Sequence, residues 1–192
     1  MGVAERKGRE RATRERRITD AARMIAAHDG WNAVTIRRLA EEIEYSQPVL
    51  YSHFENRDAI VAAVAVEGFR ELAAALREAA HVSADRRSAL CNVANAYLGF
   101  TCEHPALYEA MFTMPTPLRF ADPDTKPELR AAFSALKAVV SPLEQNNEVS
   151  TETFWAALHG LAELERSGRI RRSARDERVA LVVDGLFHSR RA

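Results

Sequence analysis

Polar and aromatic residues crowd a short stretch of this chain, and their side chains suit contacts with DNA. They are Gln47, Tyr51, Ser52 and His53, which remain as a polar and aromatic surface of a predicted helix once its apolar residues turn inward. Hydroxyl, amide and imidazole groups can meet base edges and phosphates in a major groove. Apolar neighbours such as Leu50 can turn inward. The spacing therefore predicts a helix with a buried side and a side suited to nucleic acid.

Two short helices joined by a tight turn must position this surface. The first is expected over positions 35–43, with Thr35 as its N-cap and with Arg37 on the charged face. Its apolar residues recur at the i, i+3, i+4, i+7 spacing of a buried stripe. They are Ile36, Leu39, Ala40 and Ile43. Ser46 can cap the second helix, with Pro48 in its first turn, where a missing N–H costs nothing. The pattern predicts a helix-turn-helix.

The motifs in this region resemble those of the TetR family of bacterial transcriptional repressors. The resemblance covers roughly residues 16–69. Its motifs are Asp29-Gly30-Trp31, Thr35-x-x-x-Leu39-Ala40-Glu41, Ser46-Gln47-Pro48-Val49-Leu50-Tyr51-Ser52-His53-Phe54 and Asn56-Arg57-Asp58. In that family the segment is the DNA-reading head. The resemblance implies that Tyr51 contacts a phosphate and that Arg57, where lysine is more usual, reaches the DNA backbone.

The helix pattern and the resemblance together define the expected DNA-contacting residues. These are Thr35, Arg37, Ser46, Gln47, Pro48, Val49, Tyr51, Ser52, His53 and Arg57. Side chains near the start of the second helix should meet base edges, so Ser46 and Gln47 are expected to set sequence preference. Tyr51, His53 and Arg57 are expected to strengthen binding to all sequences.

One residue of the turn departs from the family pattern. Glu44 stands where glycine is usual. A left-handed residue there would cost about 1 kcal/mol without glycine. A carboxylate near phosphates is also unfavourable for binding.

Charge is balanced over the whole chain but not along it. The 192 residues carry 27 basic and 27 acidic side chains, so no global field favours nucleic acid. Residues 1–15 are expected to form a flexible basic arm, because positions 5–17 hold seven Arg or Lys against three Glu. The arm can lie along a phosphate backbone or in a minor groove, or it can be a solvated, frayed terminus.

Helical periodicity recurs throughout, without convincing strand alternation, so the fold should be all-α with about nine helices. Residues 16–60 are expected to form a three-helix DNA-binding domain and residues 61–192 an effector-binding and dimerisation domain. A long helix from about Arg57 connects the two and would act as a lever between them. Prolines between 115 and 127 predict a loop or broken helix.

Two late helices, at about 151–167 and 175–190, carry apolar stripes that predict a homodimer on a palindromic operator. The expected interface residues are Phe154, Leu158, Leu161, Glu165, Val179, Val182, Val183, Leu186 and Phe187. In the family, such helices form a four-helix bundle with their copies in a second subunit. The alternative is that both stripes pack on their own domain. The stretch Trp155-Ala156-Ala157-Leu158-His159-Gly160 resembles a tryptophan, histidine, glycine pattern of one branch of these domains.

A regulator also needs a site where a regulatory ligand binds. The second domain is rich in aromatic and methionine side chains that could line such a site. A small hydrophobic effector is expected to bind there. The candidate pocket residues are Tyr97, Phe100, His104, Tyr108, Met111, Phe112, Phe133, Trp155 and His159. The alternative is that most of them are core. Effector binding would release a repressor from its operator; corepressor-dependent control, activation and a helical dimer that does not bind DNA stay open.

An enzyme is not expected. The sequence has no nucleophile elbow, phosphate-binding glycine loop or Cys-x-x-Cys pair, and its six histidines have no i, i+4 pairing, so no catalytic, cofactor or metal site is expected. Cys91 and Cys102 lie about 16 Å apart in one predicted helix and are expected to be free thiols. The N-terminus lacks an apolar leader, and no run approaches a membrane span, so a cytoplasmic protein without a membrane partner is expected.

Overall fold

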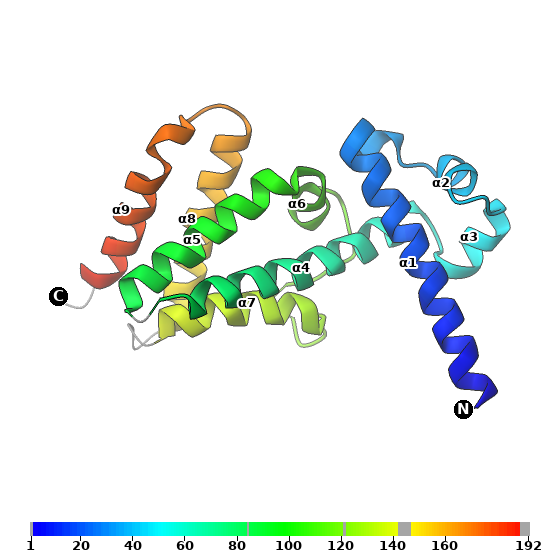
Figure 1. The fold of residues 1–192 in the computed structure, drawn as a ribbon, viewed down its shortest axis with the longest axis horizontal. Helices are drawn as coiled ribbons and strands as arrows, with labels where there is room; N and C mark the ends of the chain where they lie inside the picture. The colour runs from blue at the N-terminus through cyan, green and yellow to red at the C-terminus, as the bar shows by residue number, and fades with distance from the viewer. Residues whose placement is uncertain (1, 84, 121, 142–146, 189–192) are drawn as a thin grey trace. The chain divides into compact units, whose positions relative to one another are not determined.

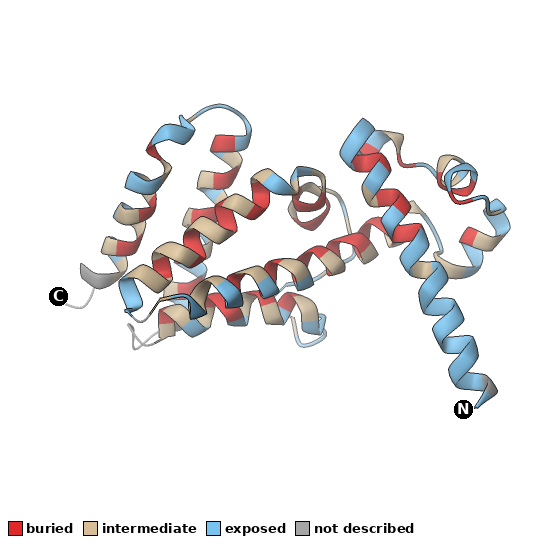
Figure 2. Ribbon diagram, viewed as in Figure 1, coloured by how far each residue is buried: buried red, intermediate tan, exposed pale blue. Residues whose placement is uncertain are grey.

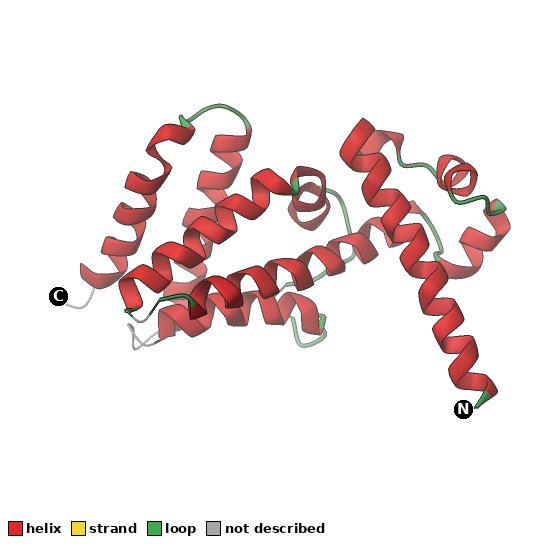
Figure 3. Cartoon of the chain, viewed as in Figure 1, coloured by secondary structure: helices red, strands yellow, loops and turns green. Residues whose placement is uncertain are grey.

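The chain folds into helices throughout the part that the computed structural model describes, residues 2–83, 85–120, 122–141 and 147–188. Within these ranges there are nine α-helices and no strand, which confirms the all-α prediction (Figures 1 and 3). In chain order the α-helices are α1 (Val3–Asp29), α2 (Ile36–Glu42), α3 (Gln47–His53), α4 (Arg57–His81), α5 (Arg86–Glu103), α6 (Pro105–Phe112), α7 (Pro127–Val140), α8 (Asn147–Arg166) and α9 (Arg175–His188). Two short 3₁₀ turns, η1 (Trp31–Ala33) and η3 (Arg172–Ala174), precede α2 and α9.

The chain divides into two compact units whose boundary differs from the expected one at residue 60. The first unit is Met1–Gly68 with His104–Asp124, and the second is Phe69–Glu103 with Thr125–Ala192. Helix α6, which the sequence placed in the second domain, belongs to the first unit. One reason is that the buried Trp31 donates its indole N–H to the Ala106 carbonyl at 2.8 Å. Proximity along the chain does not reveal such a contact.

Glycine lets α4 and α6 approach closely within the first unit. A Cβ added to Gly68 would lie 2.6 Å from the Met111 sulfur and 2.9 Å from the Leu107 Cδ1. Any larger residue would therefore displace these side chains.

Helix α1 begins far earlier than its apolar stripe. Residues 3–15, expected as a flexible arm, have a helical backbone that is continuous with the packed part of the helix. The Glu5 carboxylate accepts the Gly2 N–H at 3.3 Å, and Arg11 pairs with Glu15 at 2.7 Å, one helical turn along. The helix ends as predicted at Gly30, whose φ is +78°.

In the second unit, α5 packs against α7, α8 and α9. Residues coloured as buried recur along each of these helices (Figure 2). Four residues expected at a dimer interface lie in this core and are almost completely inaccessible: Phe154, Leu158, Val179 and Val183. These four side chains are therefore already covered by their own unit, and their place at a dimer interface stays a prediction. Leu161, Val182 and Leu186 are half-buried, and the side chain of Phe187 lies outside the described part.

Glu165, also expected at the interface, is the centre of an internal charge cluster. Its side chain is 2% exposed, and its carboxylate accepts hydrogen bonds from Arg175 at 2.5 Å and from Arg178 at 2.8 Å. Burial raises the pKa of Glu165, but the two guanidinium groups outweigh it and hold the pKa below its ordinary value. Arg175 also donates to the Cys102 sulfur at 3.2 Å. Glu165 therefore joins α8 to α9.

Both cysteines lie on α5 as free thiols, as predicted. Among the described residues, none of the helices has the length and apolar character needed to cross a membrane.

Candidate nucleic-acid interface

Helices α2 and α3 form the predicted helix-turn-helix in the first unit. The Thr35 hydroxyl caps α2 by accepting the Arg38 backbone N–H at 3.1 Å. Leu39 and Leu50, one from each helix, are fully buried, and both helices contact α1. The apolar stripes therefore fix the polar surface of α3 on a packed support.

The turn between the two helices contains a strained residue. Glu44 has a φ of +56°, and among the described residues it alone is a non-glycine with positive φ. The left-handed conformation is therefore present at the position where the family pattern has glycine, and it has the cost that the sequence indicated. The Tyr45 N–H, one residue on, donates to the Ala40 carbonyl at 2.9 Å and closes the end of α2.

The outer face of α3 carries three polar side chains with no partner in the described part of the chain: Ser46, Gln47 and Tyr51. Ser46 occupies the N-cap position as predicted, but its hydroxyl makes no capping bond. Tyr51 is 53% exposed. These groups can therefore bind an external partner without breaking an internal hydrogen bond.

Two other expected contacts are engaged inside the head. The side chain of His53 is 6% exposed, and its Nδ1 lies 3.4 Å from the Glu15 carboxylate of α1, so it is not part of an exposed reading surface. Arg57 donates from Nε to the Val34 carbonyl at 2.8 Å and from Nη2 to the Trp31 carbonyl at 2.6 Å. Both residues hold elements of the head together, which is a role that motif matching does not reveal.

The remaining expected DNA-contacting residues differ in their exposure and in whether their polar atoms already have internal partners. Pro48 is exposed, whereas Val49 is half-buried. The Ser52 hydroxyl donates to the Val49 carbonyl at 2.7 Å. Arg37 is exposed but pairs with Glu41 at 2.8 Å, which raises the pKa of the guanidinium. A phosphate contact by Arg37 would compete with that pair.

A contact absent from the motifs supports the turn. Arg17 of α1 donates to the Tyr45 hydroxyl at 3.1 Å, and its guanidinium carbon lies 5.1 Å from the centre of the Tyr45 ring. Tyr45 directly follows the strained Glu44. Since Arg17 and Tyr45 are 28 positions apart, no local pattern could have paired them.

The expected effector-pocket residues are divided between the two units. His104, Tyr108, Met111 and Phe112 belong to the first unit, and Tyr97, Phe100, Phe133, Trp155 and His159 to the second. Within the second unit, three of them come together. The Trp155 indole N–H donates to the Tyr97 hydroxyl at 3.1 Å, and the rings of Trp155 and Phe133 meet edge to face at 6.5 Å.

His159 follows Trp155 by one helical turn on α8. Burial of the imidazole lowers the pKa of His159, and the nearby Glu163 only partly opposes this. The imidazole is therefore neutral at neutral pH, with one nitrogen able to donate and one able to accept a hydrogen bond.

A packed helix-turn-helix with an outward polar face, followed by a separate helical unit, defines the class of helix-turn-helix DNA-binding regulators. Comparison with known families agrees. Residues 18–64 match the model of the tetR family of bacterial regulatory proteins, and residues 90–186 match a tetracyclin repressor-like C-terminal domain. The chain belongs to the TetR family of transcriptional regulators, which is not a class of enzymes.

Individual relatives are similar to different extents. Rv0681, an HTH-type transcriptional regulator of Mycobacterium tuberculosis, is 29% identical over 154 residues, which are 79% of this chain and 69% of that protein. Rv1474c, an HTH-type transcriptional repressor of the same organism, is 38% identical over 63 residues, 33% of this chain and 34% of that protein. A solved protein of unknown function from Rhodococcus sp. RHA1 shares the fold with a TM-score of 0.73 at 23% identity, covering 91% of this chain and 94% of its own. The resemblance to the tryptophan, histidine, glycine branch stays a prediction.

Proposed function

We propose that this protein is a cytoplasmic repressor that binds a palindromic operator as a homodimer and leaves it when a small hydrophobic effector binds the second unit. The observation that carries the DNA-binding part is the outer face of α3. There Ser46, Gln47 and Tyr51 are exposed on a packed helix and have no internal partners. Repression is supported by the name of the relative Rv1474c.

The dimer part is supported by an outward face on α8 and α9 that no described element covers. Leu164 is 39% and Leu181 72% exposed. Gly160 and Gly185 are also exposed, and a Cβ added to either would meet nothing within 4 Å. Small residues let two helices approach closely, and a two-fold copy would cover this face. The proposed interface is therefore opposite the buried stripe that the sequence indicated.

The effector part is supported by the group of Tyr97, Phe133 and Trp155, which come from α5, α7 and α8. An apolar ligand among these rings can gain aromatic contacts. To shift the repressor from 1:99 to 99:1, the effector must prefer the released state by about 5.5 kcal/mol. Helix α4 contributes residues to both units and is the element through which a shift would pass.

The test is selection of bound sequences from a random duplex library with the purified protein, with its mass measured by light scattering in parallel. The expected result is a palindromic consensus bound by a dimer. No enrichment of any sequence at low salt would overturn the DNA-binding part of the proposal.

Two variants of α3 separate base contacts from phosphate contacts. Gln47→Ala should change the ranking of operator variants, because an amide near the start of α3 meets base edges. Tyr51→Phe should weaken binding to all sequences about equally, because a phosphate contact carries no sequence information. Exposed Arg77 of the second unit provides the control, and Arg77→Gln should leave both properties unchanged. An unchanged ranking in Gln47→Ala would remove Gln47 from the base contacts.

A further inference from the structure

About the first three turns of α1 extend beyond the packed part of the head. The first fully buried residue of the helix is Ile18, and the residues from Ala4 to Arg14 are exposed. A solvated helical extension of this kind buries no apolar surface, so packing does not account for it. Its composition, rich in arginine, points to an external partner.

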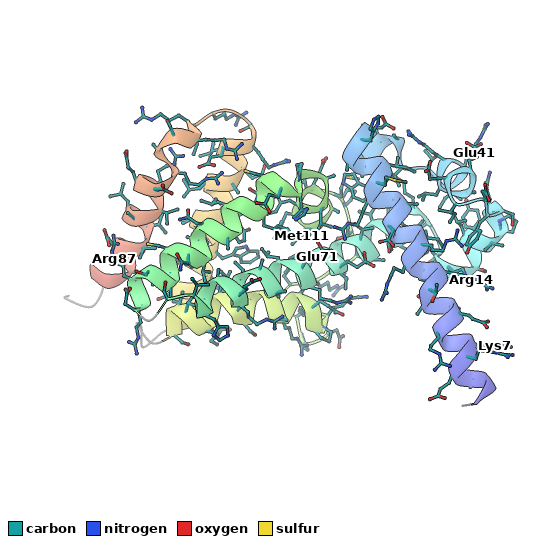
Figure 4. All side chains as sticks on the ribbon, viewed as in Figure 1. Lys7, Arg14, Glu41, Glu71, Arg87 and Met111 are labelled. Carbon is teal, nitrogen blue, oxygen red and sulfur yellow. The ribbon has the colours of Figure 1, made fainter. Side chains whose placement is uncertain are left out.

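Two basic residues of this extension lie on the face that the head uses. Lys7 and Arg14 are seven residues apart, and Ile18 and Ala21 continue the same stripe at the next turns. The flanks of this stripe contact the reading motif, since Glu15 meets His53 and Arg17 meets Tyr45. Figure 4 shows Lys7 and Arg14 projecting from the side of α1 on which α2 and α3 lie.

The positive charges of these two side chains are also not neutralised by ion pairs within the described part of the chain. Among the described residues, Lys7 and Arg14 make no hydrogen bond or ion pair, whereas Arg6 lies 3.8 Å from Glu10 and Arg11 pairs with Glu15. A polyanion along this face could therefore bind both side chains without breaking an internal ion pair.

We infer that the N-terminal extension of α1 is a second DNA-binding element, in which Lys7 and Arg14 contact the phosphate backbone beside the site read by α3. Lys7 and Arg14 are about 10 Å apart along the helix, which spans roughly three phosphates of one strand. The contacts are independent of sequence, so they add affinity and salt dependence without changing the preferred operator. This inference rests on the proposed DNA-binding function.

The test compares the double variant Lys7→Gln, Arg14→Gln with wild type on two duplexes of equal length, one carrying the selected consensus and one of mixed sequence. Arg16 is the matched control: it is exposed and without a partner in the described part of the chain, and it lies on the opposite face of α1. Arg16→Gln removes one charge from the same segment but from the face that turns away from α3.

The salt dependence of binding gives the quantitative expectation. Each lost phosphate contact lowers the slope of log affinity against log salt by about 0.9, so a dimer that loses two contacts per protomer changes by about 3.6. Between 50 and 200 mM salt, wild type should then lose about 150-fold more affinity than the double variant. The order of preferred sequences should not change, and ethylation of phosphates beside the consensus should interfere with wild type but not with the double variant.

A proline variant tests whether the extension acts as a helix. Ala12→Pro keeps every charge but breaks the helix between Lys7 and Arg14, so the phosphate contact of Lys7 should be lost in each protomer. The slope of log affinity against log salt should then fall by about 1.8 per dimer. Ala4→Pro, in the first turn where proline is tolerated, is its control. If Ala12→Pro bound like wild type, the extension would act as a charged tail, and the helical contact would be overturned.

The failures of this inference and of the proposed function are distinguishable. If wild type selects a consensus and the double variant has the slope of Arg16→Gln, the second element is overturned and the regulator stands. If wild type selects no sequence but binds the mixed duplex with a slope that depends on Lys7 and Arg14, the second element stands without an operator. Failure to bind either duplex would overturn both.

Discussion

Glu44 has a left-handed backbone conformation that is unfavourable for a residue with a side chain. Its φ of +56° suits glycine, and its β-carbon makes that conformation costly. We expect Glu44→Gly to raise the free energy of unfolding by about 0.5 to 1 kcal/mol, since relief of strain exceeds the added entropy of the unfolded chain. Urea denaturation followed by circular dichroism measures the change.

Glu44→Ala is the control for this substitution. It removes the carboxylate but keeps the β-carbon, so the left-handed strain persists and no comparable gain is expected. Equal gains from alanine and glycine would show that charge, and not backbone conformation, makes Glu44 unfavourable.

His159 makes stability depend on pH. Burial holds its pKa below the ordinary value of 6.5, so the unfolded chain binds a proton before the folded chain does. The free energy of unfolding should therefore be unaffected by His159 above pH 6.5 and should fall as the pH drops from 6.5 through the lowered pKa. His159→Gln should lose less stability than wild type over the same interval in urea titrations. Parallel curves for the two proteins would contradict the assignment.

The reading residues show what sequence can and cannot establish about single side chains. Thr35 was identifiable as a cap because its role depends only on local spacing. The engagement of His53 with Glu15 and of Arg57 with two carbonyls depends on segments 38 and about 25 positions away. A motif match reports which residue type stands at a position, but not whether its polar atoms are already bonded.

At the scale of the elements, the Glu165 carboxylate joins α8 to α9, and removing its charge should lower the free energy of unfolding. In Glu165→Gln, Arg175 and Arg178 lose the carboxylate that neutralises them, and breaking such a buried group typically costs about 3 to 5 kcal/mol. Thermal unfolding should show a large loss, and Glu163→Gln on the same helix is the control. Glu163 pairs with Arg166 at 3.5 Å on a more exposed surface, where a pair contributes about 1 kcal/mol or less.

The same cluster predicts an acid dependence. The pKa of Glu165 in the folded state is below its ordinary value of 4.5, so its contribution is complete above that pH and is lost as the pH falls through the lowered pKa. Glu165→Gln should therefore unfold with a flatter pH profile than wild type below about pH 4.5. If both proteins had the same profile, other carboxylates would account for the acid sensitivity.

The features that the sequence did not predict share one physical cause: they do not depend on local apolar spacing. Helices α2 and α3, by contrast, were predicted from that spacing, which is a local property. The extension of α1 has little apolar surface, so its helix depends on favourable residue types, on the bond from the Gly2 N–H to Glu5 and on ion pairs one turn apart. An apolar stripe also does not reveal what covers it, which is why Leu158 and Val183 were assigned to a partner although their own domain buries them.

Assembly is the property of the whole molecule that decides how two reading heads meet one operator. The outward face of α8 and α9 exposes Leu181 by 72%, and Gly160 and Gly185 leave room beside it for an approaching helix. We expect Leu181→Arg to weaken dimerisation by at least about 2 kcal/mol, roughly 30-fold, because a charge would be buried at the centre of the interface. Its helical content should be unchanged, since the side chain contributes little to the core of its own chain.

Val82 supplies the matched control for this prediction. It is 76% exposed and lies outside α8 and α9, so Val82→Arg adds the same charge at a site that the proposed interface does not include. Light scattering should give the mass of a monomer for Leu181→Arg and of a dimer for Val82→Arg at the same concentration. Because a palindrome is bound tightly only when both heads are linked, Leu181→Arg should also lose its preference for the full operator over a single half-site. A Leu181→Arg protein that stays dimeric and keeps that preference would place the interface on another face.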